Sequence, residues 1–141
     1  MLKTSFLALA AMLAATSSAG AYGAIAIGGN TADAATKGIA VGITKDYGTA
    51  AEAEEAAVKK CLAFTAAPAE TVAKCKVVQS FSHEWVVVAL DPGDSTPGFG
   101  WSIDADKASA ERNAMSQCKA SSPDDRKPFC KIAGEMDDTK P

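Results

Sequence analysis

Two stretches with the same order of features constrain this chain more than anything else in it. The first closes a helix-like segment at Cys61, crosses a loop to Cys75 and continues into a strand-like run that ends near Phe81. The second repeats this order with Cys118 and Cys130. Four cysteines permit three disulfide connectivities. Because only the local pairing, Cys61 with Cys75 and Cys118 with Cys130, can form in both copies independently, the repeat predicts one disulfide in each copy.

A zinc site and a redox-active dithiol are the alternative uses of four cysteines. A structural zinc site needs Cys-x2–4-Cys knuckles, whereas the cysteines of each copy here lie 14 and 12 residues apart. The chain also has no Cys-x-x-Cys motif, which disfavours a thiol oxidoreductase. We therefore expect the cysteines to be structural, and we expect no metal ion and no cofactor.

The first 21 residues have the pattern of a cleaved export signal. Lys3 supplies a basic start, residues 6–15 are apolar, and Ala19-Gly20-Ala21 provides small residues on either side of a cleavage point. The apolar run is shorter than the roughly 20 residues of a transmembrane helix, and no later stretch approaches that length. The sequence thus predicts a periplasmic or secreted protein that starts at Tyr22, with no integral membrane segment after cleavage.

The charge of the predicted mature chain argues against nucleic acid as a partner. Removing residues 1–21 from the 141 leaves 120 residues with 13 basic and 17 acidic side chains. Binding to a phosphate backbone depends on a basic patch that releases counterions. No basic run is longer than a dipeptide such as Lys59-Lys60, so neither nucleic acid nor an anionic lipid surface is an expected partner.

Each copy reads as strand, strand, helix, strand. Alternating apolar residues and turn residues predict the strands, and Thr49 and Asp106 are expected to cap the helices, with Thr49 and Glu52 spaced as a capping box. The two helices are expected to end near Leu62 and Cys118. The expected strands span residues 22–27, 38–43 and 75–81 in the first copy, and 85–90, 98–103 and 131–133 in the second.

These elements predict an α+β fold built from a duplicated β-β-α-β unit. Hairpins pair as antiparallel strands, so we expect a largely antiparallel sheet of about six strands with two helices packed on it. Residues 22–135 would form one domain, with unit one at 22–81, unit two at 85–133 and a flexible tail at 136–141. How the two units pair is left open by the sequence.

With the units laid out, the order of motifs resembles the domain of unknown function 4189 family. The motifs are Tyr22-Gly23-Ala24-Ile25-Ala26, the Thr49-x-x-Glu52-Ala53-Glu54 helix start, Cys61, Cys75-Lys76-Val77-Val78 and Gly98-Phe99-Gly100-Trp101-Ser102. The resemblance implies a small exported bacterial domain with structural disulfides, and it brings no known catalytic or binding residues. The chain departs from the family pattern at Ile39-Ala40-Val41-Gly42, where an aromatic strand is usual, and at Ser82-His83-Glu84, where some members have a cysteine.

Two glutamates and one tryptophan are the candidate site residues. Aligning the cysteines matches Glu54 with Glu111 at one constant offset, and each glutamate falls within the apolar stripe of its helix. A carboxylate in such a place needs a partner or loses its charge. The two glutamates either tie helix to sheet or form an acid/base pair. Trp101 either belongs to the core or, with Phe99, presents an aromatic face to a partner.

Two other polar groups have simpler explanations. His83 is the only histidine, lies at the junction of the units and has no Gly-x-Ser-x-Gly motif to accompany it, so we expect an exposed junction residue. Asp91, Asp94 and Ser95 lack the alternating acidic spacing of a calcium loop, so we expect a turn.

The favoured hypothesis is a non-enzymatic exported module that binds a macromolecule of the cell envelope or extracellular space. It follows from the leader, the duplication and the lack of a nucleophile, base and orienting group in any recognisable arrangement. The alternative hypothesis is a small envelope hydrolase, or an inhibitor of one, that uses Glu54 with Glu111 or the Trp101 strand. The identity of the ligand and the oligomeric state are not determined by the sequence.

Overall fold

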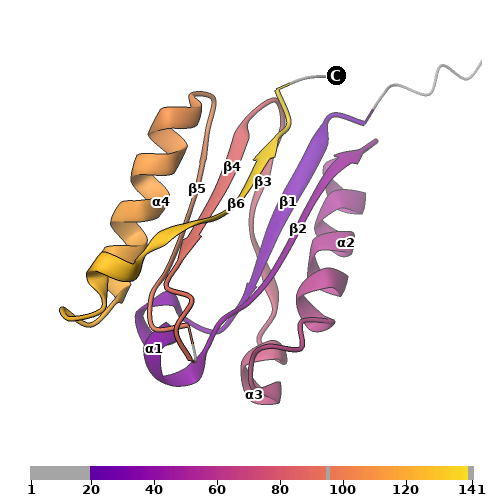
Figure 1. Cartoon of the computed structure of the whole chain (residues 1–141). Helices are drawn as coiled ribbons and strands as arrows, with labels where there is room; N and C mark the ends of the chain where they lie inside the picture. Colours follow the sequence, from indigo (N-terminus) through magenta and orange to yellow (C-terminus); the bar gives the residue numbers. More distant parts are fainter. Residues whose placement is uncertain (1–19, 95, 140–141) are drawn as a thin grey trace, which may run out of the picture.

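The computed structural model describes residues 20–94 and 96–139, and the two predicted units are evident in it (Figure 1). Unit one contains β1 (Tyr22–Gly28), β2 (Ala40–Tyr47), α2 (Ala50–Leu62) and β3 (Lys76–Phe81). Unit two contains β4 (Trp85–Leu90), β5 (Phe99–Asp104), α4 (Lys107–Ser121) and β6 (Lys131–Asp137). Short helices α1 (Ala34–Lys37) and α3 (Ala69–Val72) and the 3-10 turns Thr31–Asp33 and Lys127–Phe129 lie in the connections. The predicted α+β fold and its duplicated unit are confirmed.

The strands of the described residues form two antiparallel sheets, one in each unit. Their strand orders are β2-β1-β3 and β5-β4-β6. Figure 1 shows the two sheets facing each other, with α2 outside one and α4 outside the other. The sequence predicts about six strands in a single sheet. The number of strands is right, and the structure divides them between two sheets. The result is four layers, helix, sheet, sheet, helix.

The two faces of each central strand explain this division. On β1, Ile25 and Ile27 point between the sheets and pack with Val88 and Phe99 of unit two. The alternate residues of β1 face α2, as the period of two in a strand requires. A strand that is apolar on both faces needs a cover on each side. In each unit the helix supplies one cover and the other sheet supplies the second.

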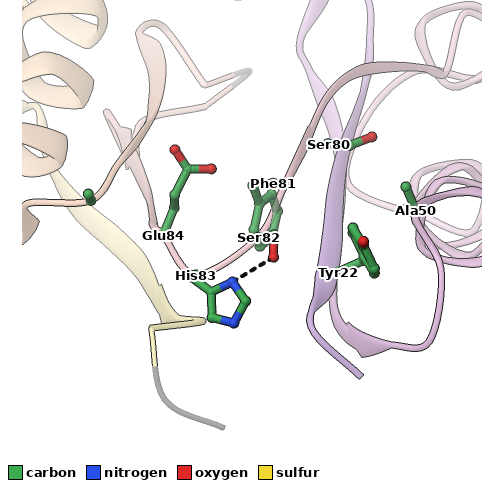
Figure 2. Close-up of a pocket in the computed structure, with 8 residues that line it drawn as sticks. Tyr22, Ala50, Ser80, Phe81, Ser82, His83 and Glu84 are labelled. Atoms are coloured by element: carbon green, nitrogen blue, oxygen red, sulfur yellow. Dashed lines mark hydrogen bonds between the residues drawn. The ribbon is translucent and has the colours of Figure 1, made fainter. Parts of the chain in front are cut away.

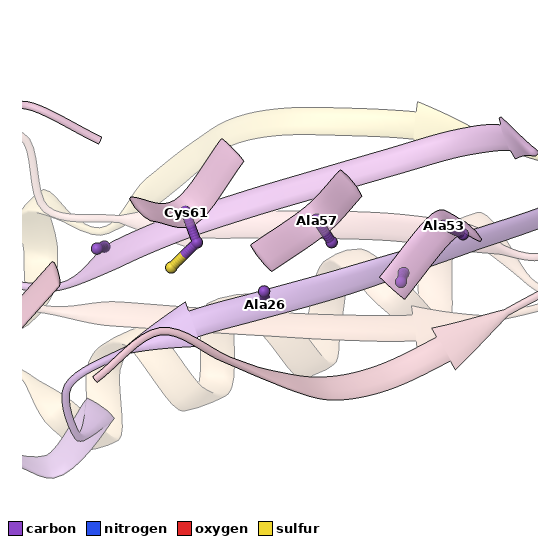
Figure 3. Packing of buried hydrophobic residues seen from close by; sticks show 6 residues of the cluster. Ala26, Ala53, Ala57 and Cys61 are labelled. Carbon is purple, nitrogen blue, oxygen red and sulfur yellow. The ribbon is translucent and has the colours of Figure 1, made fainter. Parts of the chain in front are cut away.

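Small side chains bring each helix close to its sheet. Under α2, the buried cluster is made of Ala24, Ala26, Ala40, Ala53, Ala57 and Cys61, four of which are labelled in Figure 3. Under α4, Val87 and Ala89 of β4 meet Ala110, Ala114 and Cys118. The apolar stripes that the sequence predicted for both helices are therefore the stripes that pack on the sheets.

A glycine in each second strand lies directly beneath the helix. A Cβ atom added at Gly42 would lie 2.2 Å from the carbonyl oxygen of Ala57, and one added at Gly100 would lie 2.2 Å from the carbonyl oxygen of Ala114. Both distances are far inside van der Waals contact, and the obstructing atoms belong to backbone. The backbone of each helix thus rests on the backbone of the strand, which no residue with a side chain permits.

Both predicted helix caps are present. The Thr49 hydroxyl accepts a hydrogen bond from the Glu52 amide at 3.3 Å, and the Asp106 carboxylate accepts one from the Ser109 amide at 2.8 Å. The Glu52 carboxylate departs from the expected capping box. It accepts a hydrogen bond from the Thr49 hydroxyl at 3.0 Å, whereas a capping box would have it accept from the Thr49 amide.

Both predicted disulfides are confirmed. Cys61 is bonded to Cys75 and Cys118 to Cys130, with Cα–Cα distances of 5.8 and 6.0 Å. Each bond joins the last turns of a helix to the residue just before the third strand of the same unit. Each unit is therefore closed covalently on itself, and two disulfides indicate that the protein matures in an oxidising compartment.

The end of the last strand differs from the sequence prediction. The last strand was expected at 131–133 and a flexible tail at 136–141, but β6 continues to Asp137 and pairs with β4 as far as Trp85. Asp138 is 4% exposed, and its amide donates to the carbonyl oxygen of Glu84. The tail prediction is thus wrong for 136–138, because pairing across the sheet outweighs the polar local sequence. The predicted leader falls almost wholly in residues 1–19, outside the described part of the chain.

Candidate functional site

The two candidate glutamates lie on opposite sides of the molecule. Glu54 is on α2 and Glu111 is on α4, and both sheets lie between these helices (Figure 1). Packed sheets alone are about 10 Å apart, and each helix adds a further layer. Since paired glycosidase carboxylates lie within about 10 Å of each other, the structure does not bring Glu54 and Glu111 together as an acid/base pair.

Glu54 links its helix to the edge of sheet one. Its carboxylate accepts a hydrogen bond from the hydroxyl of Ser80, on β3. This contact matches the structural role that the sequence analysis offered for the glutamate, a tie between helix and sheet. Glu54 and Ser80 are both half-buried, so the second carboxylate oxygen remains close to solvent.

Glu111 takes part in a different arrangement, centred on a lysine. The ammonium group of Lys107 lies 2.7 Å from Oε2 of Glu135, 3.5 Å from Oε1 of Glu111, and 5.1 Å from the centroid of the Trp85 ring. The hydrogen bond with Glu135 raises the pKa of Lys107, and the same contact lowers the pKa of Glu135. We call Lys107, Glu111, Glu135 and Trp85 the lysine cluster. It combines charge pairing with a cation–π contact.

A surface pocket lies where the chain passes from unit one to unit two. It is an open depression of about 580 Å³, lined by Tyr22, Ala50, Ser80, Phe81, Ser82, His83, Glu84 and Ala105. Figure 2 shows the Tyr22 ring and Ala50 on one side of this junction pocket and His83 and Glu84 on the other. Tyr22 is 41% exposed, so an aromatic ring faces the solvent there. No sequence motif predicted this pocket, because β1, α2 and the β3–β4 turn meet there only in three dimensions.

His83 is exposed at the junction, as predicted. It has a positive φ of 59° in the turn between β3 and β4, and its Nδ1 lies 2.8 Å from the Ser82 hydroxyl (Figure 2). The His83 amide donates to the carboxylate of Asp138 at 3.1 Å, which holds the turn against the end of β6. Among residues 20–94 and 96–139, no third group orients the imidazole ring of this Ser-His contact, as a catalytic triad requires.

Trp101 is half-buried and packs against the apolar cluster between the two sheets. Its side chain joins the inner cluster with Phe99, which is 1% exposed. The Trp101 amide donates to Oε1 of Gln117 at 3.4 Å, so a side chain of α4 covers this part of the edge of β5. Of the two roles considered for Trp101, the core position is the one that this packing supports.

Asp91 was expected to serve in a turn, and it does so within a buried ion pair. Its Oδ1 accepts from the Gly93 amide at 2.9 Å, the turn contact. Arg126 donates to both carboxylate oxygens, at 2.8 and 2.6 Å, and Asp91 is 0% exposed. These hydrogen bonds from Arg126 hold the pKa of Asp91 below its usual value. The pair fixes the β4–β5 connection to the loop that follows α4.

Loss of the Arg126 guanidinium is expected to destabilise the fold markedly. Arg126→Met leaves a buried carboxylate with a single amide donor, at a cost of about 2 kcal/mol in the free energy of unfolding. Urea unfolding followed by tryptophan fluorescence measures this. Lys127→Met is the matched control, because its partner Asp124 is exposed and the expected change is within about 0.5 kcal/mol. Equal losses in both variants would contradict the role of the buried pair.

The ion pair of Asp91 and Arg126 is also expected to make the free energy of unfolding depend on pH in the acidic range. Because folding lowers the pKa of Asp91 from its ordinary 3.8, the pair stabilises the fold fully above that pH, and the contribution is lost as the pH falls through the lowered value. Between pH 5 and 2, the wild type should therefore lose more stability than Asp91→Asn/Arg126→Met. Parallel curves for the two proteins would contradict this.

The described residues offer no metal-ligand cluster of three or more His, Cys, Asp or Glu side chains. Within the same residues, no helix has the length and apolar character needed to cross a membrane.

The fold and the junction pocket define a class of protein: a duplicated, disulfide-closed α+β domain with an aromatic pocket between its repeats. The sequence profile described as "Domain of unknown function (DUF4189)" matches residues 22–136, which is most of the chain. The protein belongs to this family, as the order of its motifs indicated. Neither the curated proteins nor the solved structures contain a significant match.

Proposed function

We propose that this protein is an exported, non-enzymatic binding module and that the junction pocket is its binding site. The pocket is the observation that carries the proposal. It has the size of a small-ligand or side-chain site, and its lining combines a solvent-facing ring, Tyr22, with the hydroxyl groups of Ser80 and Ser82 and the carboxylate of Glu84.

Two further features support a binding role in the envelope or outside the cell. The disulfides stabilise the protein in an oxidising compartment. Among the described residues, Glu54 and Glu111 lie on opposite helices and no second group orients the ring of His83, so neither candidate has the arrangement that its reaction requires.

The proposal is tested by asking whether a partner is retained through the pocket. The protein is produced with its own leader and a C-terminal affinity tag, and is used to capture partners from envelope extract and culture fluid. Ala50→Trp places an indole in the pocket, whereas Ala51→Trp adds the same group at an exposed neighbour outside its lining. We expect the wild type and Ala51→Trp to retain the same partner and Ala50→Trp to lose it.

Equal capture by all three proteins would show that the partner does not use the pocket. The hydrolase alternative is examined with Glu54→Gln and Glu111→Gln. Robust turnover of an envelope substrate that disappears in both variants would overturn the binding proposal in favour of an enzyme.

A further inference from the structure

The two units have structurally equivalent positions that are occupied by different side chains. The constant offset that aligns Cys61 with Cys118 also aligns Ala50 with Lys107 and Glu54 with Glu111. The structure supports this alignment, because the helix residues above Gly42 and Gly100 are those that the offset matches. The first residue of α2 is thus the counterpart of the lysine at the start of α4.

The strands extend the correspondence. Ala24 of β1 and Val87 of β4 are both buried beneath their helices. Ala24 pairs with Ser80 on β3, and Val87 pairs with Glu135 on β6. Ser80 is therefore the counterpart of Glu135. Two residues before Ala24 and Val87, on the same face of each strand, stand Tyr22 and Trp85.

The junction pocket occupies the place that the lysine cluster fills in unit two. Three of its lining residues, Tyr22, Ala50 and Ser80, are the counterparts of Trp85, Lys107 and Glu135. The fourth member of the cluster, Glu111, corresponds to Glu54, which is bound to Ser80. In unit two the long side chain of Lys107 covers an aromatic ring. In unit one the methyl group of Ala50 leaves the equivalent volume open, with the ring and the carboxylate still in place.

The charges around the pocket suit a cation. Glu54 and Glu84 lie at or beside it, and the Asp138 carboxylate accepts from the backbone of the lining residue His83. A basic side chain, Lys45, reaches the same end of β6: its ammonium group donates to the carbonyl oxygen of Asp137 at 3.3 Å and lies 3.5 Å from the carboxylate of Asp46. Three carboxylates, those of Glu54, Glu84 and Asp138, are thus at or near the pocket, and Lys45 is already engaged by Asp46 and the chain at Asp137.

We propose that the junction pocket binds an alkylammonium group, of the kind a lysine side chain carries, in the position that Lys107 holds within unit two. The inference rests on the proposed binding function and names the chemistry of its ligand. The ammonium group would donate to Glu54 and to the lone pairs of the Ser80 hydroxyl, while its charge lies over the Tyr22 ring. The alkyl chain would extend past Ala50, as the side chain of Lys107 does on α4.

The probe is Nα-acetyl-lysine N-methylamide, titrated into ¹⁵N-labelled protein and followed by amide chemical shifts. Its Nζ-acetylated form, which has the same stem without the charge, is the matched control. We expect saturable shifts centred on Tyr22, Ala50 and Ser80, with the charged probe binding about tenfold more tightly, as a cation–π contact and one ion pair together provide.

Two variants exchange the residue types at the equivalent first positions of α2 and α4. Ala50→Lys should supply the pocket with its own ammonium group and weaken binding at least about tenfold, whereas Ala51→Lys adds the same charge outside the pocket and should bind as the wild type does. Lys107→Ala should open a second site, with new shifts near Trp85 and Glu135. Lys119→Ala, which removes a charge from the exposed end of the same helix, should open none.

Equal binding of both probes would overturn the inference and leave the binding function standing on apolar contacts. Binding to Ala50→Lys at wild-type strength would overturn it as well. If neither probe binds while Ala50→Trp still abolishes partner capture, the alkylammonium assignment is wrong and the pocket proposal stands. If neither probe binds and Ala50→Trp captures the partner normally, both proposals are wrong.

Discussion

Replacing Gly100 by alanine is expected to lower the free energy of unfolding by about 3 kcal/mol, and Gly42→Ala should behave alike, because overpacking a close-packed interior costs roughly this much. The added methyl group would sit 2.2 Å from a helix carbonyl oxygen at either position, and 2.4–2.5 Å from the amide nitrogen of the helix cysteine. These obstacles are backbone atoms that no rotamer change can move. Relief requires α2 or α4 to lift from its sheet, which loosens the alanine contacts beneath it.

Gly134→Ala is the matched control for these variants. Gly134 also lies on a strand, β6, but a Cβ atom there meets nothing within 4 Å. Alanine at that position should be neutral or stabilise by up to about 1 kcal/mol, since it reduces the freedom of the unfolded chain. Chemical denaturation of the three variants measures the difference. Similar stabilities for all three would show that the helices do not depend on contact with glycine backbone.

Removal of either disulfide should have the second large effect. Each bond closes a loop of about 15 residues, and the chain-entropy estimate assigns about 3 kcal/mol to a loop of that length. Cys61→Ala/Cys75→Ala and Cys118→Ala/Cys130→Ala are therefore each expected to lose about that amount. The four-alanine variant should lose close to the sum, because the two bonds lie in separate units.

Thermal unfolding of these variants, with and without a reducing agent, provides the measurement. Reduction of the wild type should reproduce the four-alanine protein, and reduction of that protein should change nothing further. If the variants unfold at the wild-type temperature, the bonds do not stabilise the units. If one bond carries the whole effect, the two units differ in how far they depend on covalent closure.

Much of the architecture could be predicted from the sequence because its causes are local. Capping at Thr49 and Asp106, the apolar stripes of both helices and the spacing of the cysteines all act within a few turns of chain. The apolar run of β4 suits its place between β5 and β6, where one face packs on α4 and the other on the facing sheet. Long-range partners escaped this reasoning. The hydrogen bond from Arg126 to Asp91 joins residues 35 positions apart, and no local sequence pattern near either residue predicts it.

The candidate site shows the same division. Sequence alignment of the repeats singled out Glu54 and Glu111 and thus found one member of each equivalent cluster. It could not show that the glutamates lie on opposite outer faces, nor that Trp101 packs, half-buried, against the cluster between the sheets. Those facts depend on how two sheets stack, and apolar burial between sheets is not directional.

By itself, the sequence determined the repeated unit, its helices, its strands and its disulfides, because periodicity, capping and a duplicated cysteine pattern are properties of neighbouring residues. Only the tertiary structure decided that the units stack as two sheets, that β6 extends to Asp137, and that a pocket opens beside Ala50 where Lys107 fills the equivalent place. The physical reason is that packing compares surfaces from distant parts of the chain. An alanine and a lysine at matched positions become an open pocket and a filled one only after both units have folded.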